Sequence, residues 1–448
     1  RRQSPRPSDG FLAASLPRRP PAWYQSLNMC AISRRLVTNT HEVVIVGAAV
    51  RRLPHVGVGG DVAEVDVAIF VDRLDHDHGC DTWLGTHFLR WRCRFLGAGL
   101  GAVRHARVLS GLTWLRPMKA VLVTCGLPPG VLDGGPRRRV EVVLDELDRG
   151  WQVPFALCAP DDVTSMRPRS ASVLVENITL CTEPLHSVSN STIRRVKDHL
   201  EYHARQGAFL DVYDLDGSAA PAVAALVAAG RARYFPRFPR AVSRHVGQLA
   251  KETKREAAAG CSCGLQEAHC LLRNRGRSRW VVPRLDPDEF FARSAAPGGL
   301  PCRGELSDFA ATGMFGSDVA QSLLAVVFIG SAEFGGRPAA PESAPAYQRF
   351  VRRSPRRTPR WIPVVNPENV LTTHIHTVRP RPGSFAIDFW GVALHHYLEA
   401  FGHVRRSFIG ADRLRFVRYD ARLARRCARW APGAGLWRQA AERAARYK

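Results

Sequence analysis

Lysine is scarce in this sequence of 448 residues: only five residues are Lys, so 59 of the 64 Lys and Arg residues are Arg. Surfaces that bind nucleic-acid phosphates generally use both side chains, Lys as a point charge and Arg as a fork. Because the Arg excess accompanies abundant Ala, Gly and Pro, we interpret the net charge of +24 as a compositional bias. We therefore expect no nucleic-acid partner. Nucleic-acid binding stays open as an alternative, and its affinity would fall steeply with salt.

Long hydrophobic runs are also absent. The apolar run at residues 323–330, for example, is far shorter than the roughly 18–20 apolar residues that cross a membrane as a helix. No signal peptide is recognisable. The chain begins with Arg instead of Met. We therefore expect any membrane association to depend on an N-terminal anchor that is missing from this sequence.

Eleven cysteines are present, but their spacing shows neither a disulfide framework nor a zinc site. Cys261 and Cys263, with His269 and Cys270, lack the usual C-x2-C spacing of zinc ligands. Residues 75–81 are rich in Asp and His, but neighbouring side chains on a strand point to opposite faces. We interpret that segment as a solvated loop.

Composition and patterning divide the chain into three parts. Residues 1–116 form a poorly defined N-terminal region, with disorder as one option, because the first 40 residues are rich in Pro, Arg and Ser. Residues 117–420 carry regular strand and helix patterns. Residues 421–448 are rich in Arg and are typical of a basic helix or tail.

The central part alternates between strand and helix patterns. Strands are expected at residues 119–125, 151–158, 173–181, 209–213, 231–235 and 280–282, and helices at 193–207 and 219–229. Residues 139–147 fit either type. Short connections between these elements indicate a parallel α/β sheet, in which ligands bind beyond the carboxyl ends of the strands. Asp214 lies at one such end. Pro283 should end the last strand, because it lacks a backbone donor.

An acidic motif follows that last strand. Asp286 and Asp288 flank Pro287, and Glu289 comes next. Two carboxylates at this spacing can converge on one hard divalent cation through a turn, and such a cation can neutralise a departing diphosphate. The alternative is the acidic first turn of a helix, where carboxylates are favoured by the helix dipole.

Several further motifs precede and follow this one in a definite order, and together they span about residues 174–420. They are Cys181-Thr182-x-Pro184-Leu185-His186, Val196 to His203 with Gly207, Val212-Tyr213-Asp214, Ala229-Gly230-Arg231, Cys270-Leu271, Arg279-Trp280-Val281, Asp286-x-Asp288-Glu289-Phe290, Phe328-Ile329-Gly330-Ser331, Tyr347 to Arg353, Asn366 to Val370, His374-Ile375-His376 and Leu414 to Tyr419. Their order resembles glycosyltransferase family 92, which includes the plant galactan synthases and nematode galactosyltransferases. The chain departs from the family pattern at Ala268-His269 and at Pro283-Arg284.

The resemblance implies an α/β fold of the GT-A type, a twisted and mostly parallel sheet flanked by helices, with an irregular N-terminal extension. It implies that Asp286 and Asp288 bind Mn²⁺ or Mg²⁺ together with a UDP-sugar donor. His376, or else His374, would complete the metal shell. Tyr213 and Asp214 would lie near the nucleotide.

The implied activity is an inverting transfer of a hexose, with galactose the expected sugar, from the nucleotide-sugar to a glycan acceptor. An inverting transfer needs one carboxylate to accept the acceptor's proton, and Glu333 is the first candidate, with Asp318 next. The implied location is the Golgi or secretory-pathway membrane, where Asn177 and Asn190 would be glycosylation acceptors. The alternative is a catalytically inactive relative that binds glycans or serves as a scaffold.

Overall fold

The computed structural model describes residues 28–29, 34–37, 41–53, 62–73, 90–96, 99–101, 103–109, 120–128, 139–158, 176–238, 264–293, 324–335, 341, 344, 349, 352–374, 376–381, 384–397 and 418–419. Residues 75–81, Cys261, Cys263, Asp318 and the 421–448 tail, for which predictions were made above, lie outside these ranges.

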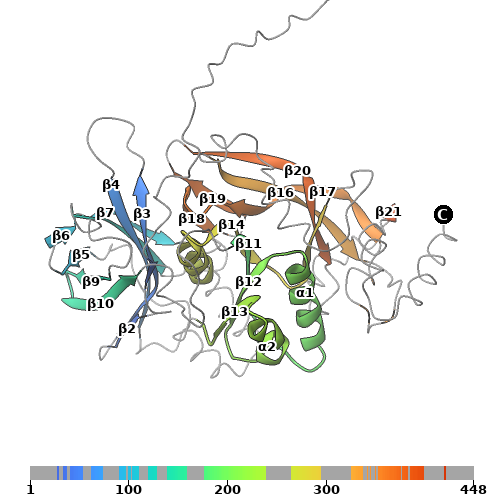
Figure 1. The fold of residues 1–448 in the computed structure, drawn as a ribbon, viewed down its shortest axis with the longest axis horizontal. Helices are drawn as coiled ribbons and strands as arrows, with labels where there is room; N and C mark the ends of the chain where they lie inside the picture. Colours follow the sequence, from blue (N-terminus) through green and yellow to red (C-terminus); the bar gives the residue numbers. More distant parts are fainter. Residues whose placement is uncertain are drawn as a thin grey trace, which may run out of the picture.

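The first of two large sheets has ten strands, and all its neighbouring strands run antiparallel (Figure 1). Its strands are β1 (Asn28–Met29), β2 (Arg34–Val37), β3 (His41–Leu53), β4 (Val62–Arg73), β5 (Trp91–Phe95), β6 (Gly99–Gly101), β7 (Val103–Leu109), β8 (Ala120–Gly126), β9 (Val140–Glu146) and β10 (Trp151–Cys158). They lie in the order β6-β5-β9-β10-β1-β3-β4-β8-β7, with β2 on β3. This sheet crosses the boundary expected at residues 116 and 117.

The first sheet curls around its own hydrophobic core. Alternate residues of its strands point to one face, as in β5, where the burial alternates along Trp91, Cys93 and Phe95. Cys93 in β5 and Cys125 in β8 form a disulfide, although the two strands lie near opposite ends of the sheet order. Only a curled sheet brings them together.

The second sheet has nine strands in the order β13-β12-β11-β14-β17-β16-β20-β15, with β21 on β17. Its elements are β11 (Glu176–Thr182), α1 (Ile193–Arg205), β12 (Phe209–Asp214), α2 (Ala220–Ala228), β13 (Ala232–Pro236), a helix at residues 264–274, β14 (Ser278–Leu285), β15 (Glu289–Arg293), β16 (Leu324–Gly335), β17 (Arg352–Val365), β20 (Phe385–Tyr397) and β21 (Arg418–Tyr419). A separate hairpin consists of β18 (Val370–His374) and β19 (Thr377–Pro380).

Helices pack on both faces of the second sheet. Helices α1 and α2 cover one face, where Val196, Leu200 and Val223 join a core with residues of β11, β12 and β14. The helix at 264–274 lies on the other face, between the two sheets (Figure 1). A Cβ atom added to Gly47 in β3 would lie 3.4 Å from Leu272 Cδ1, so this helix packs closely against β3. The hydrophobic core is therefore continuous between the two sheets.

The predicted fold class, a mostly parallel GT-A sheet flanked by helices, is wrong. Strands make up most of the described residues, with only three helices among them, and the chain forms curled β-sheet. Among the named strands of the described residues, parallel pairing occurs in β13-β12-β11-β14 and between β16 and β20. The helix and strand alternation that predicts parallel pairing covers only residues 176–236, whereas the flanking segments alternate as antiparallel strands do.

The predicted end of a strand at Pro283 is also wrong, because β14 continues to Leu285. The register between β11 and β14 shifts at this point: Leu180 pairs with Val282, and Thr182 pairs with Leu285. Pro283 therefore lies in an irregularity, where its missing backbone donor is not needed by the neighbouring strand. Its carbonyl oxygen accepts a hydrogen bond from Gln266 Nε2 at 2.7 Å.

Candidate functional site

Four carboxylates gather where β11 and β14 end. Glu183 follows β11, and Asp286 follows its parallel neighbour β14. The Glu183 backbone N–H donates to the Leu285 carbonyl at 3.0 Å, so the two strand ends are aligned. A turn then brings Asp288 and Glu289 to the same edge, with the Glu289 N–H bonded to the Asp286 carbonyl at 3.0 Å. We call Glu183, Asp286, Asp288 and Glu289 the acidic cluster.

Two cationic side chains lie within the acidic cluster. The Arg284 guanidinium spans two of the carboxylates, with Nε 3.1 Å from Asp286 Oδ1 and a terminal nitrogen 2.9 Å from Glu183 Oε2. His396, on β20, has Nε2 3.4 Å from Asp288 Oδ2. Each aspartate of the acidic motif is therefore paired with a cation supplied by the protein.

Glu289 is held by the backbone and by an aromatic side chain. Its Oε2 accepts a hydrogen bond from the Asp286 N–H at 3.1 Å, and its Oε1 accepts one from Trp361 Nε1 at 2.7 Å. Its carbonyl oxygen lies 3.0 Å from His199 Nε2 on α1. These contacts join the turn that carries Glu289 to β17 and to α1, and they hold Glu289 in place.

Burial and crowding shift the proton affinities of the cluster. Burial, followed by the charge of Asp286, raises the pKa of Glu183 well above its ordinary value. The same two causes raise the pKa of Glu289 to about 7. Burial opposes the charged form of Asp286 as well, but Arg284 and a hydrogen bond with Glu183 outweigh it and lower the pKa of Asp286.

His396 is the counterpart of these acids. Burial disfavours its charged form, yet the charges of Asp288, Glu289 and Asp286 outweigh burial and raise its pKa to about 9. At neutral pH the imidazolium form therefore lies against Asp288. His199, by contrast, bonds to the Glu289 carbonyl, and burial outweighs the nearby carboxylate charges and lowers its pKa to about 4.

The predicted metal ligand His376 lies beside this cluster. It is exposed, in the turn between β18 and β19, and its Nδ1 forms a hydrogen bond with the Trp361 carbonyl at 2.5 Å. Its ring lies 4.4 Å from the Trp361 ring, which in turn lies 5.7 Å from the ring of His396. His374 is the last residue of β18.

The structure places Tyr213 in the hydrophobic core. Its side chain is fully buried, its ring stacks on Phe235, and its hydroxyl forms a 2.7 Å hydrogen bond with His269 Nδ1. These contacts hold the side chain away from the acidic cluster. No described contact joins Tyr213 to a carboxylate of that cluster.

Asp214 lies at the same edge of the sheet as Asp286, because β12 and β14 flank β11. Its carboxylate accepts the backbone N–H groups of Gly217 at 3.0 Å and Ala219 at 2.8 Å, and the Tyr234 hydroxyl at 2.5 Å. In this arrangement Asp214 orders the loop before α2.

Glu333 lies in β16, and its Cα pairs with that of His396 in the neighbouring strand β20. His396 also pairs with Glu289 of β15 on its other side. The predicted base is therefore on a strand next to the residue that contacts Asp288. Its side chain is not among the described ones.

The acidic cluster provides the hard oxygen donors that Mn²⁺ and Mg²⁺ prefer. Crowded carboxylates with raised pKa values also fit a divalent cation, which would relieve their mutual repulsion. Within the described ranges, however, no three His, Cys, Asp or Glu side chains are spaced to hold a metal ion. The oxygen donors are of the type that these cations prefer. In this arrangement, however, Asp286 is paired with Arg284 and Asp288 is paired with His396.

Sequence reasoning missed Glu183, Arg284 and His396. A usable signal existed for Glu183, because it directly follows a predicted strand whose carboxyl end neighbours that of Asp286. His396 gave no such signal: it lies in an apolar segment far along the chain, and only the pairing of β15 with β20 brings it to the site.

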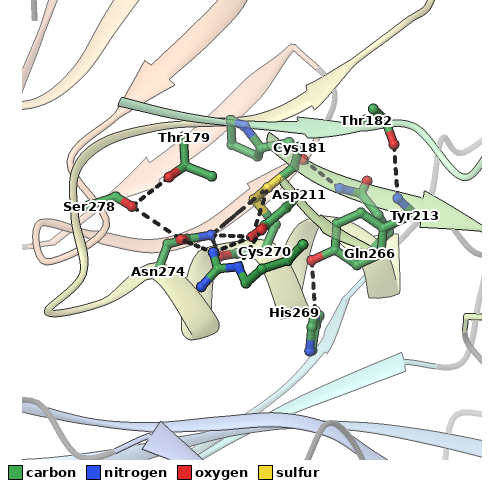
Figure 2. The surroundings of a disulfide bond; sticks show 12 residues. Thr179, Cys181, Thr182, Asp211, Tyr213, Gln266, His269, Cys270, Asn274 and Ser278 are labelled. Atoms are coloured by element: carbon green, nitrogen blue, oxygen red, sulfur yellow. Dashed lines mark hydrogen bonds and ion pairs between the residues drawn. A yellow bond between two sulfur atoms is a disulfide. The ribbon is translucent and has the colours of Figure 1, made fainter. Parts of the chain in front are cut away.

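A disulfide lies close to the acidic cluster, near the end of β11. It joins Cys181, two residues before Glu183, to Cys270 in the helix at 264–274 (Figure 2). Cys270, whose spacing from Cys261 and Cys263 did not predict a zinc site, is covalently bonded to Cys181. Asp211, beside the disulfide, accepts hydrogen bonds from Arg233 at 2.6 Å and Asn274 Nδ2 at 2.9 Å.

Comparison with protein-family models and with curated proteins found no match for this chain. The resemblance to glycosyltransferase family 92 therefore rests on the motifs quoted above. None of the helices within the described ranges is long and apolar enough to span a membrane.

Proposed function

We propose that this chain is a hexosyltransferase that moves a hexose, with galactose the expected sugar, from a UDP-sugar to a glycan acceptor. The observation that carries the proposal is the acidic cluster at the aligned ends of β11 and β14, where Asp286 and Asp288 meet Glu183 and Glu289. The motifs that resemble family 92 contribute three of these four residues. The proposal rests on these residues and does not require a GT-A fold.

Asp286 and Asp288 are the proposed ligands of Mn²⁺ or Mg²⁺, and His376, whose ring contacts Trp361, is the proposed third ligand. A divalent cation would neutralise charge on the diphosphate of the leaving nucleotide. Glu333 is the proposed base that accepts the acceptor's proton, in keeping with its backbone position beside His396.

The proposed location is the secretory pathway. Two disulfides, Cys93–Cys125 and Cys181–Cys270, support an oxidising compartment. Asn190 lies exposed in the turn before α1, where a glycan would have room. The partners proposed are the nucleotide-sugar and the glycan acceptor, without nucleic acid.

The test is release of UDP from a panel of UDP-hexoses by the full chain in the presence of Mn²⁺. Asp288→Asn should lower turnover by at least about a hundredfold, the size expected when a group that stabilises developing charge is lost. Asp148→Asn is the matched control, because Asp148 is an exposed carboxylate of the first sheet that pairs with Arg90. Equal turnover by the two variants would reject the proposal.

The second candidate function is glycan binding without catalysis. It is favoured by one observation, the pairing of both aspartates with protein cations. It predicts that glycans bind the full chain with no UDP released from any donor, and that Asp288→Asn leaves this binding unchanged.

A further inference from the structure

Strand β15 lies at one end of the second sheet, and among the described strands it pairs only with β20. The Asp288 carbonyl accepts the Tyr397 N–H of β20 at 2.8 Å. Because backbone groups alternate in direction along a strand, those of Phe290 also face β20, and those of Glu289 and Phe291 point away from it. We call this second side the outer edge of β15. Backbone groups on such an edge are a template on which another strand can add.

Three side chains of α1 occupy the outer edge. His199 Nε2 lies 3.0 Å from the Glu289 carbonyl oxygen, and the Tyr202 hydroxyl donates to the Phe291 carbonyl oxygen at 2.6 Å. The Phe291 N–H donates to His203 Nε2 at 3.4 Å. All three side chains of α1 are buried. The helix therefore takes the place of a further strand, with side chains as the hydrogen-bond partners.

His203 can make its contacts only as a neutral imidazole. Its Nδ1 lies 3.0 Å from the His199 carbonyl oxygen, so Nδ1 carries the proton and donates it. Its Nε2 must keep a lone pair, because the Phe291 N–H can only donate. A second proton would set two N–H groups against each other and would place a charge on a fully buried side chain.

The described side chains that face His203 carry no negative charge that could stabilise its imidazolium form. On α1 they are His199 and Tyr202, with ring centres 4.5 and 5.1 Å away, and on β15 they are Phe290 and Phe291. Burial and the neighbouring His199 lower the pKa of His203 well below its ordinary value, and its hydrogen bond to the His199 carbonyl only partly offsets them.

We propose that α1 is a pH-sensitive latch on β15: neutral His203 holds the helix against the outer edge, and protonation of His203 releases it. Release leaves the Phe291 N–H and the carbonyl oxygens of Glu289 and Phe291 open to solvent or to an added strand. This inference is independent of the proposed sugar transfer, because it concerns the backbone of β15 and none of the proposed metal ligands.

The test is hydrogen exchange of the neighbouring Phe290 and Phe291 amides, followed by NMR on the full chain with isotope-labelled phenylalanine, from about pH 7 to about pH 5. Release exposes the Phe291 amide, so its protection, corrected for the intrinsic exchange rate, should fall as pH drops below 6.5. The Phe290 amide faces β20 and should keep its protection. It therefore reports any opening of the whole sheet.

His203→Gln keeps an acceptor for the Phe291 N–H and does not titrate in this range. One proton fewer is then taken up on release, so Phe291 protection should fall less steeply than in the wild type, by up to about tenfold per pH unit. Any remaining slope belongs to His199. Tyr202→Phe is the matched control: it removes one hydrogen bond to the same edge and should lower Phe291 protection about two- to tenfold at every pH, with the slope unchanged.

The proposal is overturned if Phe290 and Phe291 lose protection in parallel on acidification, or if the pH slope for Phe291 is the same in His203→Gln and the wild type. The first comparison needs only the wild type, so it stands even if the variant fails to fold. Loss of protection at Phe291 alone, with a shallower slope in His203→Gln, supports the latch whether or not the chain turns over a UDP-hexose.

Discussion

At the residue scale, the acidic cluster is a balance between four carboxylates and two cations. The crowding of charges raises the pKa values of Glu183 and Glu289. It also raises the pKa of His396 to about 9, so its imidazolium form persists at neutral pH. The pKa of Asp286, which Arg284 contacts directly, is lowered instead. The charge of Arg284 is the largest of the causes that lower the pKa of Asp286, so it favours the ionised form of that carboxylate.

The pKa of Glu289, raised from 4.5 to about 7, predicts a pH-dependent stability. Between these values the folded chain holds a proton that the unfolded chain has released. This contribution to the free energy of unfolding is therefore complete below pH 4.5 and is lost as pH rises through 7. Glu289→Gln should gain stability relative to the wild type as pH rises from 4.5 to about 7, by at most about 1.4 kcal/mol per pH unit, and should gain little above that. Urea unfolding at each pH measures it.

For His199 the expected change of stability with pH has the opposite sign. Its pKa is lowered from 6.5 to about 4, so the unfolded chain holds the extra proton in this range, and the wild type loses stability as pH falls. His199→Gln should gain relative to the wild type on acidification. A stability difference that stays constant with pH in both variants would contradict these assignments.

The sequence identified only part of the site at this scale. Asp286 and Asp288 are candidates in the sequence because two carboxylates at this spacing after a strand can converge on one cation. Arg284 was noted only as a departure from a motif. Its role depends on the register shift beside Pro283, and no local pattern encodes which neighbouring carboxylates a long side chain will reach.

At the element scale, residues 176–236 follow the predicted order of strands and helices. The predicted helix at 193–207 corresponds to α1, and that at 219–229 to α2. Gly207 and Gly230, which follow these two helices, have φ of 84° and 65°, values that favour glycine. These elements were predictable because their periodicity and end signals are local. The pairing of β16, β17 and β20 depends on contacts between distant segments.

The disulfide close to the acidic cluster predicts a loss of stability at this scale. Cys181 and Cys270 are 89 residues apart, so changing both to Ala should lower the free energy of unfolding by about 2–5 kcal/mol. Cys93 and Cys125 are 32 residues apart, and their loss should cost about 1 kcal/mol less by the loop-closure argument. Chemical denaturation of the two double variants makes the comparison. Equal stability of all three proteins would contradict the account.

At the scale of the whole molecule, a buried ion pair joins the two sheets. Arg275 follows the helix at 264–274, and its guanidinium lies 2.6 Å from Asp66 of β4, with both side chains fully buried. The same guanidinium donates to the carbonyl oxygens of Pro367 and Val370, each at 3.1 Å. Thr124 of β8 donates to Asp66 at 2.6 Å. Residues of the N-terminal part therefore complete the core beneath the second sheet.

This pair predicts that the sheets unfold together. Arg275→Met leaves the Asp66 carboxylate buried without its charge partner and should lower the free energy of unfolding by about 3–5 kcal/mol. Arg139→Met, which removes an exposed pair with Glu141, should change it by less than about 1 kcal/mol. Urea unfolding followed by tryptophan fluorescence and by circular dichroism should show one shared transition. Two separate transitions in the wild type would contradict the account.

The central claim is that Asp286 and Asp288 bind the cation and nucleotide of a sugar-transfer reaction. The most direct measurement is the anomalous X-ray signal of crystals of the full chain grown with Mn²⁺ and UDP. The account predicts a Mn²⁺ peak within about 2.6 Å of a carboxylate oxygen of Asp286 or Asp288, beside the UDP diphosphate. A crystal with UDP bound at another place, and no Mn²⁺ at these two carboxylates, would contradict it.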